Sequence, residues 1–98
     1  MLSLDNRNKL ISIDTISVGT LNSSLIHPRE TFEVAIKNHA ASIILCHNHP
    51  SGELKPSEDD LMVTQNLVKA GKLLGIAVVD HLIISKKEHF SFKEKKII

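Results

Sequence analysis

An apolar segment, residues 40–46, constrains the fold of this chain more than any other. Ser42 is its only hydroxyl-bearing residue, and the others are Ala, Ile, Leu and Cys. A continuous apolar run of this length is typical of a β-strand that is covered on both faces. Helical patterns precede and follow it in the sequence. We therefore expect a central strand in a sheet against which helices pack.

The other predicted strands lie toward the two ends of the chain. Residues 9–18 and 76–84 are rich in β-branched and apolar side chains, as strands are. After a turn, a short final strand is predicted over residues 89–92. Residues 1–8, which are polar from position 5 onward, are predicted to form a turn, and residues 19–24 a loop.

Two helices are predicted between the strands. The first begins at Pro28, because proline is favoured at the first helical position and Glu30 suits the first turn. The second runs from Ser57 to about Leu74. The predicted buried faces comprise Phe32, Ala35, Ile36 and His39 on the first helix and Val63, Leu67, Ala70 and Leu74 on the second. The order strand, helix, strand, helix, strand, strand predicts an α/β fold with two main helices packed on a mixed β-sheet.

The composition is that of a single globular domain, residues 1–98. Hydrophobic residues make up 42% and charged residues 23% of the chain. The formal charge of +1 and the lack of Trp and Tyr make DNA an unexpected partner for this chain alone. No apolar segment approaches the roughly 20 residues that span a bilayer, so no membrane association is expected. Because its one cysteine, Cys46, cannot form an internal disulfide, we expect a cytoplasmic protein. The composition gives no indication of an oligomeric state.

Two histidines, His47 and His49, follow the predicted central strand directly. Side chains two residues apart on a strand face the same way, so both imidazoles can converge on one point. Zinc binds imidazole nitrogen at roughly 2.0–2.1 Å in tetrahedral geometry, which suits such a pair. A His-x-His pair also occurs as ordinary polar loop residues, so the pair by itself leaves both interpretations open.

A third ligand is available at the start of the second helix. If Ser57 caps that helix, Asp60 is its third residue, and its carboxylate points back toward the loop that holds the histidines. Ser-x-x-Asp is equally close to a capping box, in which Asp60 only caps the helix. Three protein ligands would leave a fourth position for water, as in catalytic zinc sites. That water needs a general base, and the sequence leaves Glu30, Glu33 and Glu53 as competing carboxylates.

The spacing of these residues resembles a known signature. His47-x-His49, seven further residues and then Ser57-x-x-Asp60 match the motif of the JAMM (MPN-plus) metallopeptidases. More narrowly, from about Leu4 to Phe92, the chain resembles the bacterial RadC family. The segments that carry this likeness are His27-Pro28-Arg29-Glu30, His47-Asn48-His49-Pro50-Ser51-Gly52, Pro56-Ser57, Leu74-Gly75-Ile76 and Asp80-His81.

The resemblance implies a cytidine-deaminase-like MPN fold and one Zn²⁺ ion held by His47, His49 and Asp60. It implies that Glu30 is the catalytic base that hydrogen-bonds the metal-bound water, and that Ser57 stabilises the oxyanion. A plain helix cap is the alternative role of Ser57. The implied activity is that of a zinc metallopeptidase, an amide hydrolase acting on a peptide or protein. By analogy with JAMM relatives, the bond is an isopeptide bond.

RadC proteins usually carry an N-terminal helical region with a helix-hairpin-helix motif, which these 98 residues lack. Met1 is therefore expected to mark a shortened reading frame or a fragment. The likeness also supports an alternative function, a non-enzymatic module in DNA repair or other DNA transactions. Asp80-His81 is expected either to orient a metal ligand or to be a satisfied polar pair. Cys46 is expected to be a small core residue.

Overall fold

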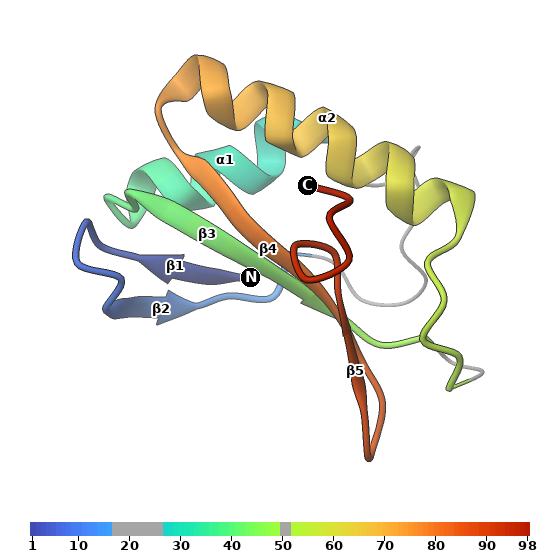
Figure 1. Cartoon of the computed structure of the whole chain (residues 1–98). Coiled ribbons are helices and arrows are strands. Elements are labelled where there is room, and N and C mark those ends of the chain that lie inside the picture. The colour runs from blue at the N-terminus through green and yellow to red at the C-terminus, as the bar shows by residue number, and fades with distance from the viewer. Residues whose placement is uncertain (17–26, 50–51) are drawn as a thin grey trace.

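The computed structural model describes residues 1–16, 27–49 and 52–98, which form five strands and two helices (Figure 1). The elements are β1 (Leu2–Leu4), β2 (Leu10–Ile13), α1 (Pro28–Lys37), β3 (Ser42–His47), α2 (Glu58–Leu74), β4 (Ala77–Ile84) and β5 (His89–Ser91). The strands form one sheet in the order β2-β1-β3-β4-β5. β3 and β4 are parallel and the other neighbours antiparallel, so the predicted α/β architecture with a mixed sheet is confirmed. Neither of these two helices is long and apolar enough to cross a membrane.

The two helices lie side by side over one face of the sheet (Figure 1). The core between the helices and the sheet is a cluster of buried apolar side chains: Met1, Phe32, Ala35, Ile43, Val63, Leu67 and Ile76. This cluster includes residues of both helices and of β3. Burial of its apolar surface therefore holds α2 over the parallel strands β3 and β4.

Helix α2 begins and ends as its sequence predicts. The hydroxyl of Ser57, the N-cap, accepts a hydrogen bond from the Asp60 N–H (3.1 Å). The Asp60 carboxylate in turn accepts one from the Ser57 N–H (2.7 Å). This reciprocal capping box satisfies backbone donors at the start of the helix. Gly75 ends the helix in the left-handed region (φ 74°), which glycine adopts without a steric cost.

The predicted turn over residues 1–8 is wrong for its first half. Leu2–Leu4 form β1, which pairs with β2 on one side and with β3 on the other. Three residues are too few to display an alternating pattern, so this strand is defined by its partners rather than by its own sequence. The predicted strand 9–18 is shorter in the structure, Leu10–Ile13. Residues 17–18 and the predicted loop 19–24 lie outside the described residues.

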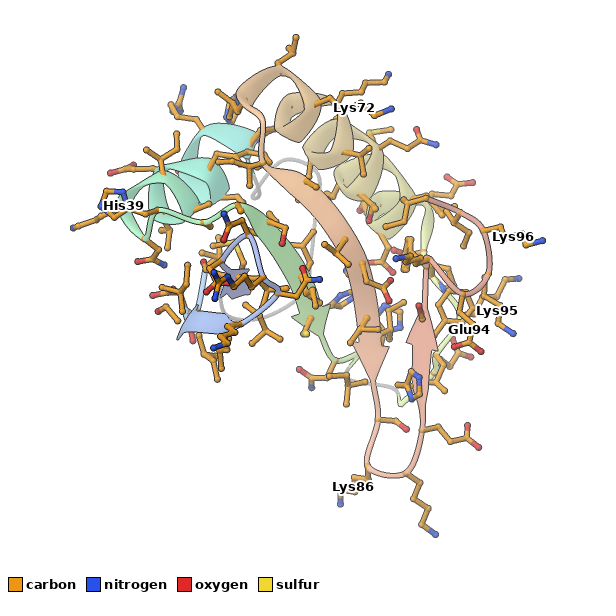
Figure 2. The ribbon with its side chains drawn as sticks, turned by 60° about the vertical axis from the view of Figure 1, so that its left-hand side comes forward. His39, Lys72, Lys86, Glu94, Lys95 and Lys96 are labelled. Carbon is orange, nitrogen blue, oxygen red and sulfur yellow. The ribbon has the colours of Figure 1, made fainter. Side chains whose placement is uncertain are left out.

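Three residues predicted to lie on buried helix faces are exposed instead. Ile36 is 54% and Leu74 51% exposed, because the buried stripe of each helix is rotated away from them. His39 lies beyond the end of α1, in the left-handed region (φ 56°), at the periphery of the molecule (Figure 2). The residues that are buried are Thr31, Phe32 and Ala35 on α1, and Asp60, Val63, Thr64, Leu67 and Gly71 on α2. The stripe of α2 is therefore polar near the start of the helix, where Asp60 and Thr64 lie.

We expect Gly71→Ala to destabilise the fold, although alanine is the better helix former. Glycine inside a helix costs roughly 0.5–1 kcal/mol relative to alanine. A Cβ at this position would, however, lie 2.3 Å from the Ile76 carbonyl oxygen and 3.3 Å from the Phe32 ring. Overpacking should therefore lower the free energy of unfolding by about 1–3 kcal/mol, measured by urea denaturation. Lys72→Ala, at the exposed next position, is the control, and a Gly71→Ala protein as stable as wild type would contradict the close approach.

Candidate metal centre

Three side chains with nitrogen or oxygen ligand atoms meet where β3 ends and α2 begins. The Nε2 atom of His47 lies 3.1 Å from Oδ1 of Asp60, and Nε2 of His49 lies 2.9 Å from Oδ2. One ligand atom from each residue lies within 4.8 Å of the others. The Asp60 carboxylate is buried, whereas both imidazoles are partly exposed. The structure thus brings together the three residues predicted as metal ligands.

The local structure explains this convergence. β3 ends at His47, and His49 follows two residues later. Asp60 lies in the first turn of α2, the helix that connects β3 to its parallel neighbour β4. That helix begins near the edge of the sheet where β3 ends. In open α/β sheets, the carboxyl ends of parallel strands are the usual position of a functional site.

The two oxygens of the Asp60 carboxylate have different partners. Oδ2 accepts the Ser57 N–H of the capping box and lies 2.9 Å from His49 Nε2. Oδ1 faces Nε2 of His47. Oδ2 therefore serves the cap and faces His49, while Oδ1 faces His47. The two roles weighed for Asp60, helix cap and metal ligand, are compatible within one carboxylate.

Both histidines turn Nε2 toward Asp60 because their Nδ1 atoms are engaged elsewhere. His49 Nδ1 lies 2.7 Å from the backbone carbonyl oxygen of Glu53, which can only accept, so this nitrogen carries the proton. His47 Nδ1 lies 2.8 Å from Nε2 of His81. The Nε2 atom of His47 is buried and has no hydrogen-bond partner within the described residues. Buried polar atoms are nearly always paired, and a metal ion would supply the missing partner.

These residues fit a zinc ion. Two imidazole nitrogens and one carboxylate oxygen are a donor set of catalytic zinc sites, which keep a fourth position open for water. Tetrahedral ligands at roughly 2.0–2.1 Å from zinc are about 3.3 Å from one another. The nitrogen–oxygen distances here, 2.9 and 3.1 Å, are close to that separation. The two distances involve different oxygens of Asp60, and the three ligand atoms lie within 4.8 Å of one another, so the side chains would close around a bound ion.

The protonation states also suit a metal. Burial lowers the pKa of His47 and outweighs the attraction of the nearby Asp60 carboxylate. Burial alone would raise the pKa of Asp60, but the hydrogen bonds from Ser57, together with the effects of the neighbouring His49 and His47, outweigh it and lower that pKa. At neutral pH, His47 is therefore neutral and Asp60 ionised. These are the forms in which imidazole and carboxylate bind metals.

His81, on β4, lies directly behind His47. Its side chain is buried, and its ring stacks on Phe92 with centroids 4.5 Å apart. Nε2 of His81 faces His47, and Nδ1 lies 2.5 Å from the hydroxyl of Thr64 on α2. Burial and then the neighbouring His47 lower the pKa of His81 to about 4, so this imidazole is neutral at neutral pH. Two roles were predicted for Asp80 and His81, to orient a metal ligand or to form a satisfied polar pair. His81 contacts a candidate metal ligand, His47.

A β-bulge at Val79 aims His81 at this centre. Ile43 and Ile44 of β3 pair with Val78 and Asp80 of β4, so Val79 is an extra residue in the ladder. In a regular strand, residues 78 and 81 would point to opposite faces. The extra residue places both on the helix-covered face, which is how a bulge redirects a side chain.

Asp80 is the satisfied polar residue of the pair. Its Oδ1 accepts the N–H groups of His81 (2.7 Å) and Lys93 (3.0 Å), and Oδ2 accepts the Ser91 hydroxyl (2.6 Å). These bonds hold the residues on either side of Phe92 against β4. Asp80 therefore holds the His81 backbone directly and supports its side chain through the Phe92 ring that stacks on it.

Cys46 is not part of the centre. Its side chain alternates away from His47 along β3 and is only partly buried, so the predicted core position is correct only in part. Burial raises the pKa of the thiol. A thiol with a raised pKa is a poor metal ligand, because the thiolate is the binding form.

The two predicted catalytic residues lie on different helices. Ser57 is the N-cap beside Asp60, and because its oxygen accepts the Asp60 N–H, its own proton remains available for donation. Glu30 is exposed in the first turn of α1. The contacts given above for the three candidate ligands do not involve Glu30, so its role as general base stays a prediction. Sequence reasoning missed Thr64, whose one signal is a hydroxyl within an otherwise apolar stripe, one turn after Asp60.

An open groove of about 790 Å³ adjoins the centre at His49. It lies between the loop after β3 and the β4–β5 hairpin, and its lining residues are Asn48, His49, Gly52, Ile84, Ser85, Lys86, Lys87 and Glu88. Figure 2 shows Lys86 at the tip of that hairpin. The groove offers space for a ligand beside the candidate metal position.

We expect the metal-free protein to lose stability as the pH falls from about 6.5 to about 4. The pKa of His81 is lowered from 6.5 to about 4 in the folded state, so the unfolded chain binds the proton first and the free energy of unfolding falls with pH. Over that window one such group accounts for about 3 kcal/mol. Urea unfolding of chelator-treated protein measures the effect. His81→Gln should lose most of the dependence, whereas the exposed His89→Gln should keep it; equal pH profiles for wild type and His81→Gln would contradict the assignment.

Comparison with known proteins agrees with the resemblance seen in the sequence. A family model described as the RadC-like JAB domain matches residues 1–97. The chain is 54% identical over 97 residues to a UPF0758 protein of Moorella thermoacetica and 53% identical over 98 residues to one of Clostridium perfringens. It is 54% identical over 95 residues to a UPF0758 protein of Caldanaerobacter subterraneus subsp. tengcongensis.

These alignments cover 97–100% of this chain but 41–43% of the relatives. The chain therefore spans about two fifths of the length of the curated relatives that it matches. The matched region contains every residue of the centre described above. This chain belongs to the family of RadC-like JAB domains.

Proposed function

We propose that this chain is a zinc-dependent hydrolase that cleaves amide bonds in a peptide or protein, with water as the nucleophile. The observation that carries the proposal is the convergence of His47, His49 and Asp60 on one position, with a buried Nε2 atom on His47 that faces the carboxylate but makes no hydrogen bond within the described residues. Membership of the JAB-like family, which includes metal-dependent hydrolases, supports it. An open fourth position distinguishes a catalytic zinc site from a structural one.

The chain's own residues would carry the proton transfers and the charge stabilisation. When bound, zinc supplies a Lewis acid that polarises a carbonyl oxygen and lowers the pKa of a coordinated water to about 7. Glu30 accepts a proton from the attacking water and delivers it to the leaving amine. The Ser57 hydroxyl, whose proton is not used by the helix cap, donates a hydrogen bond to the oxyanion of the tetrahedral intermediate.

The substrate is placed in the groove beside His49. Its lining is a mixture of polar, charged and apolar residues from the loop after β3 and the β4–β5 hairpin, which suits an extended peptide segment better than a small apolar ligand. An isopeptide bond is the expected target by analogy with JAMM enzymes, an argument from the fold family rather than from the groove. A cytoplasmic location is proposed because the one cysteine forms no internal disulfide.

A non-enzymatic module in DNA transactions is the alternative. A net charge of +1 gives it little electrostatic support. It would be favoured by DNA binding that weakens with salt and survives removal of zinc, together with the absence of hydrolysis by the zinc-loaded protein.

We expect protein that is loaded with zinc and then dialysed to retain one zinc ion per chain, measured by plasma mass spectrometry. His49→Ala removes a ligand atom and should weaken zinc binding by more than about 100-fold, beyond the usual effect of a supporting residue. His89→Ala, an exposed histidine on β5, is the matched control and should bind as wild type does. A wild-type protein that retains no zinc would sink the proposal.

Glu30→Gln should keep its zinc but lower hydrolysis by about 10²–10⁴-fold, because the amide cannot accept the proton of water. The measurement is cleavage of a panel of fluorogenic peptides and lysine-linked isopeptides by zinc-loaded protein. Glu33→Gln, on the same helix, controls for the loss of a negative charge and should stay active. Full activity of Glu30→Gln, or an equal loss in Glu33→Gln, would refute the assignment of the base.

A further inference from the structure

A continuous hydrogen-bonded chain lies behind the candidate metal centre. The backbone carbonyl of Asp60 accepts the Thr64 hydroxyl at 2.7 Å. That hydroxyl oxygen lies 2.5 Å from His81 Nδ1, and His81 Nε2 lies 2.8 Å from His47 Nδ1. Thr64 is 0% and His81 1% exposed, so bulk water does not compete for these bonds. The chain begins and ends at two of the proposed ligands, one on α2 and the other on β3.

The chemistry of these groups determines where each proton lies. A carbonyl oxygen can only accept, so Thr64 donates its single hydroxyl proton to Asp60. The Thr64 oxygen must then accept from His81, which places the His81 proton on Nδ1. Nε2 of the neutral His81 is left as an acceptor, so His47 donates from its own Nδ1. Nε2 of His47 consequently carries a lone pair, and it is one of the buried atoms that make no hydrogen bond within the described part of the chain.

We propose that Thr64 and His81 are positioning residues that hold His47 in the tautomer whose Nε2 lone pair faces the metal position. This inference rests on the proposed function, since it assigns both residues to the same metal centre. Neither contacts the metal position; both act through His47. Histidine ligands are usually oriented by a carboxylate, a carbonyl or a water. Here the imidazole of His81 orients His47, and the hydroxyl of Thr64 fixes which nitrogen of His81 carries the proton.

The competing tautomer shows why His47 needs this support. With its proton on Nε2, His47 could donate to Oδ1 of Asp60, 3.1 Å away, and the two ligands would satisfy each other instead of a metal. For His49 the Glu53 carbonyl fixes a proton on Nδ1, while Nε2 lies 2.9 Å from Oδ2 of Asp60. An imidazole accepts or donates on either nitrogen, so His81 alone would not select the tautomer of His47. The Thr64 hydroxyl, itself directed by a backbone carbonyl, makes the selection.

The fold keeps His81 in place for this task. The bulge at Val79 turns its ring toward α2, and Phe92 stacks against that ring at an interplanar angle of 17°. The ring is thereby confined between Phe92, Thr64 and His47. Its orientation is set before any metal arrives, which is the condition for a supporting residue to raise affinity.

Two substitutions of Thr64 separate the hydroxyl from the packing. Thr64→Val keeps the shape but removes the acceptor, whereas Thr64→Ser keeps the hydroxyl. Imidazole ¹⁵N–¹H correlation spectra of chelator-treated protein at neutral pH report the tautomers. Wild type and Thr64→Ser should show His47 protonated on Nδ1, and Thr64→Val should show it largely protonated on Nε2. In competition with a chromophoric chelator, Thr64→Val should bind zinc about 10- to 100-fold more weakly than wild type, and Thr64→Ser within about threefold.

The outcomes distinguish this inference from the proposed function. Spectra that show wild-type His47 protonated on Nε2, or equal zinc affinities of Thr64→Val and wild type, would overturn the positioning role and leave the hydrolase proposal standing. A wild type with the expected tautomer but no affinity for zinc would overturn the proposed function and leave the tautomer assignment standing. If Thr64→Val does not fold, as judged by circular dichroism, the wild-type spectrum decides the tautomer by itself.

Discussion

The Asp60 carboxylate is the group on which the candidate centre depends. It is 1% exposed, and an ionised group so buried costs several kcal/mol unless hydrogen bonds and opposite dipoles compensate it. The Ser57 N–H and the start of α2 supply part of that compensation, and a cation held between the carboxylate and the two imidazole Nε2 atoms would supply the rest. Thr64 follows one turn later on the same helix, and its hydroxyl contacts His81, which lies behind His47. The start of α2 therefore positions both Asp60, in front of His47, and the hydroxyl that contacts His81. Loss of the cap would therefore disturb both.

Local rules were sufficient to bring the three candidate ligands together, because each lies at the end of an element with a recognisable sequence pattern. The same rules allowed a polar loop and a helix cap as alternatives, and the preference for a metal site came from the family resemblance. The apolar segment before His47 marks a buried strand, and Ser57-x-x-Asp60 marks a helix start. Alternation along the strand and the direction of the first helical turn then bring the side chains together. The choice of Glu30 among three carboxylates came from family resemblance alone, since no periodicity distinguishes them.

Features that depend on pairing between distant segments could not be predicted in this way. β1 has three residues and exists because β2 and β3 pair with it on both sides. The bulge at Val79 reverses the facing of every later residue of β4, so alternation from Val78 would have turned His81 away from the centre. The burial of Thr64 follows from the contact of α2 with the sheet. The contacts behind His47 are thus a product of tertiary structure, whereas the positions of the candidate ligands in front of it follow from local sequence.

We propose that two imidazoles and a carboxylate hold zinc at the end of β3. Zinc K-edge X-ray absorption of the loaded wild-type protein is the decisive measurement, because the fine structure reports the type and distance of the ligand atoms. We expect nitrogen and oxygen ligands at roughly 2.0–2.1 Å, with the scattering pattern of two imidazole rings and no sulfur. A sulfur ligand at roughly 2.3 Å, from Cys46, the one cysteine of this chain, would contradict it. A spectrum of fully hydrated zinc would contradict it equally.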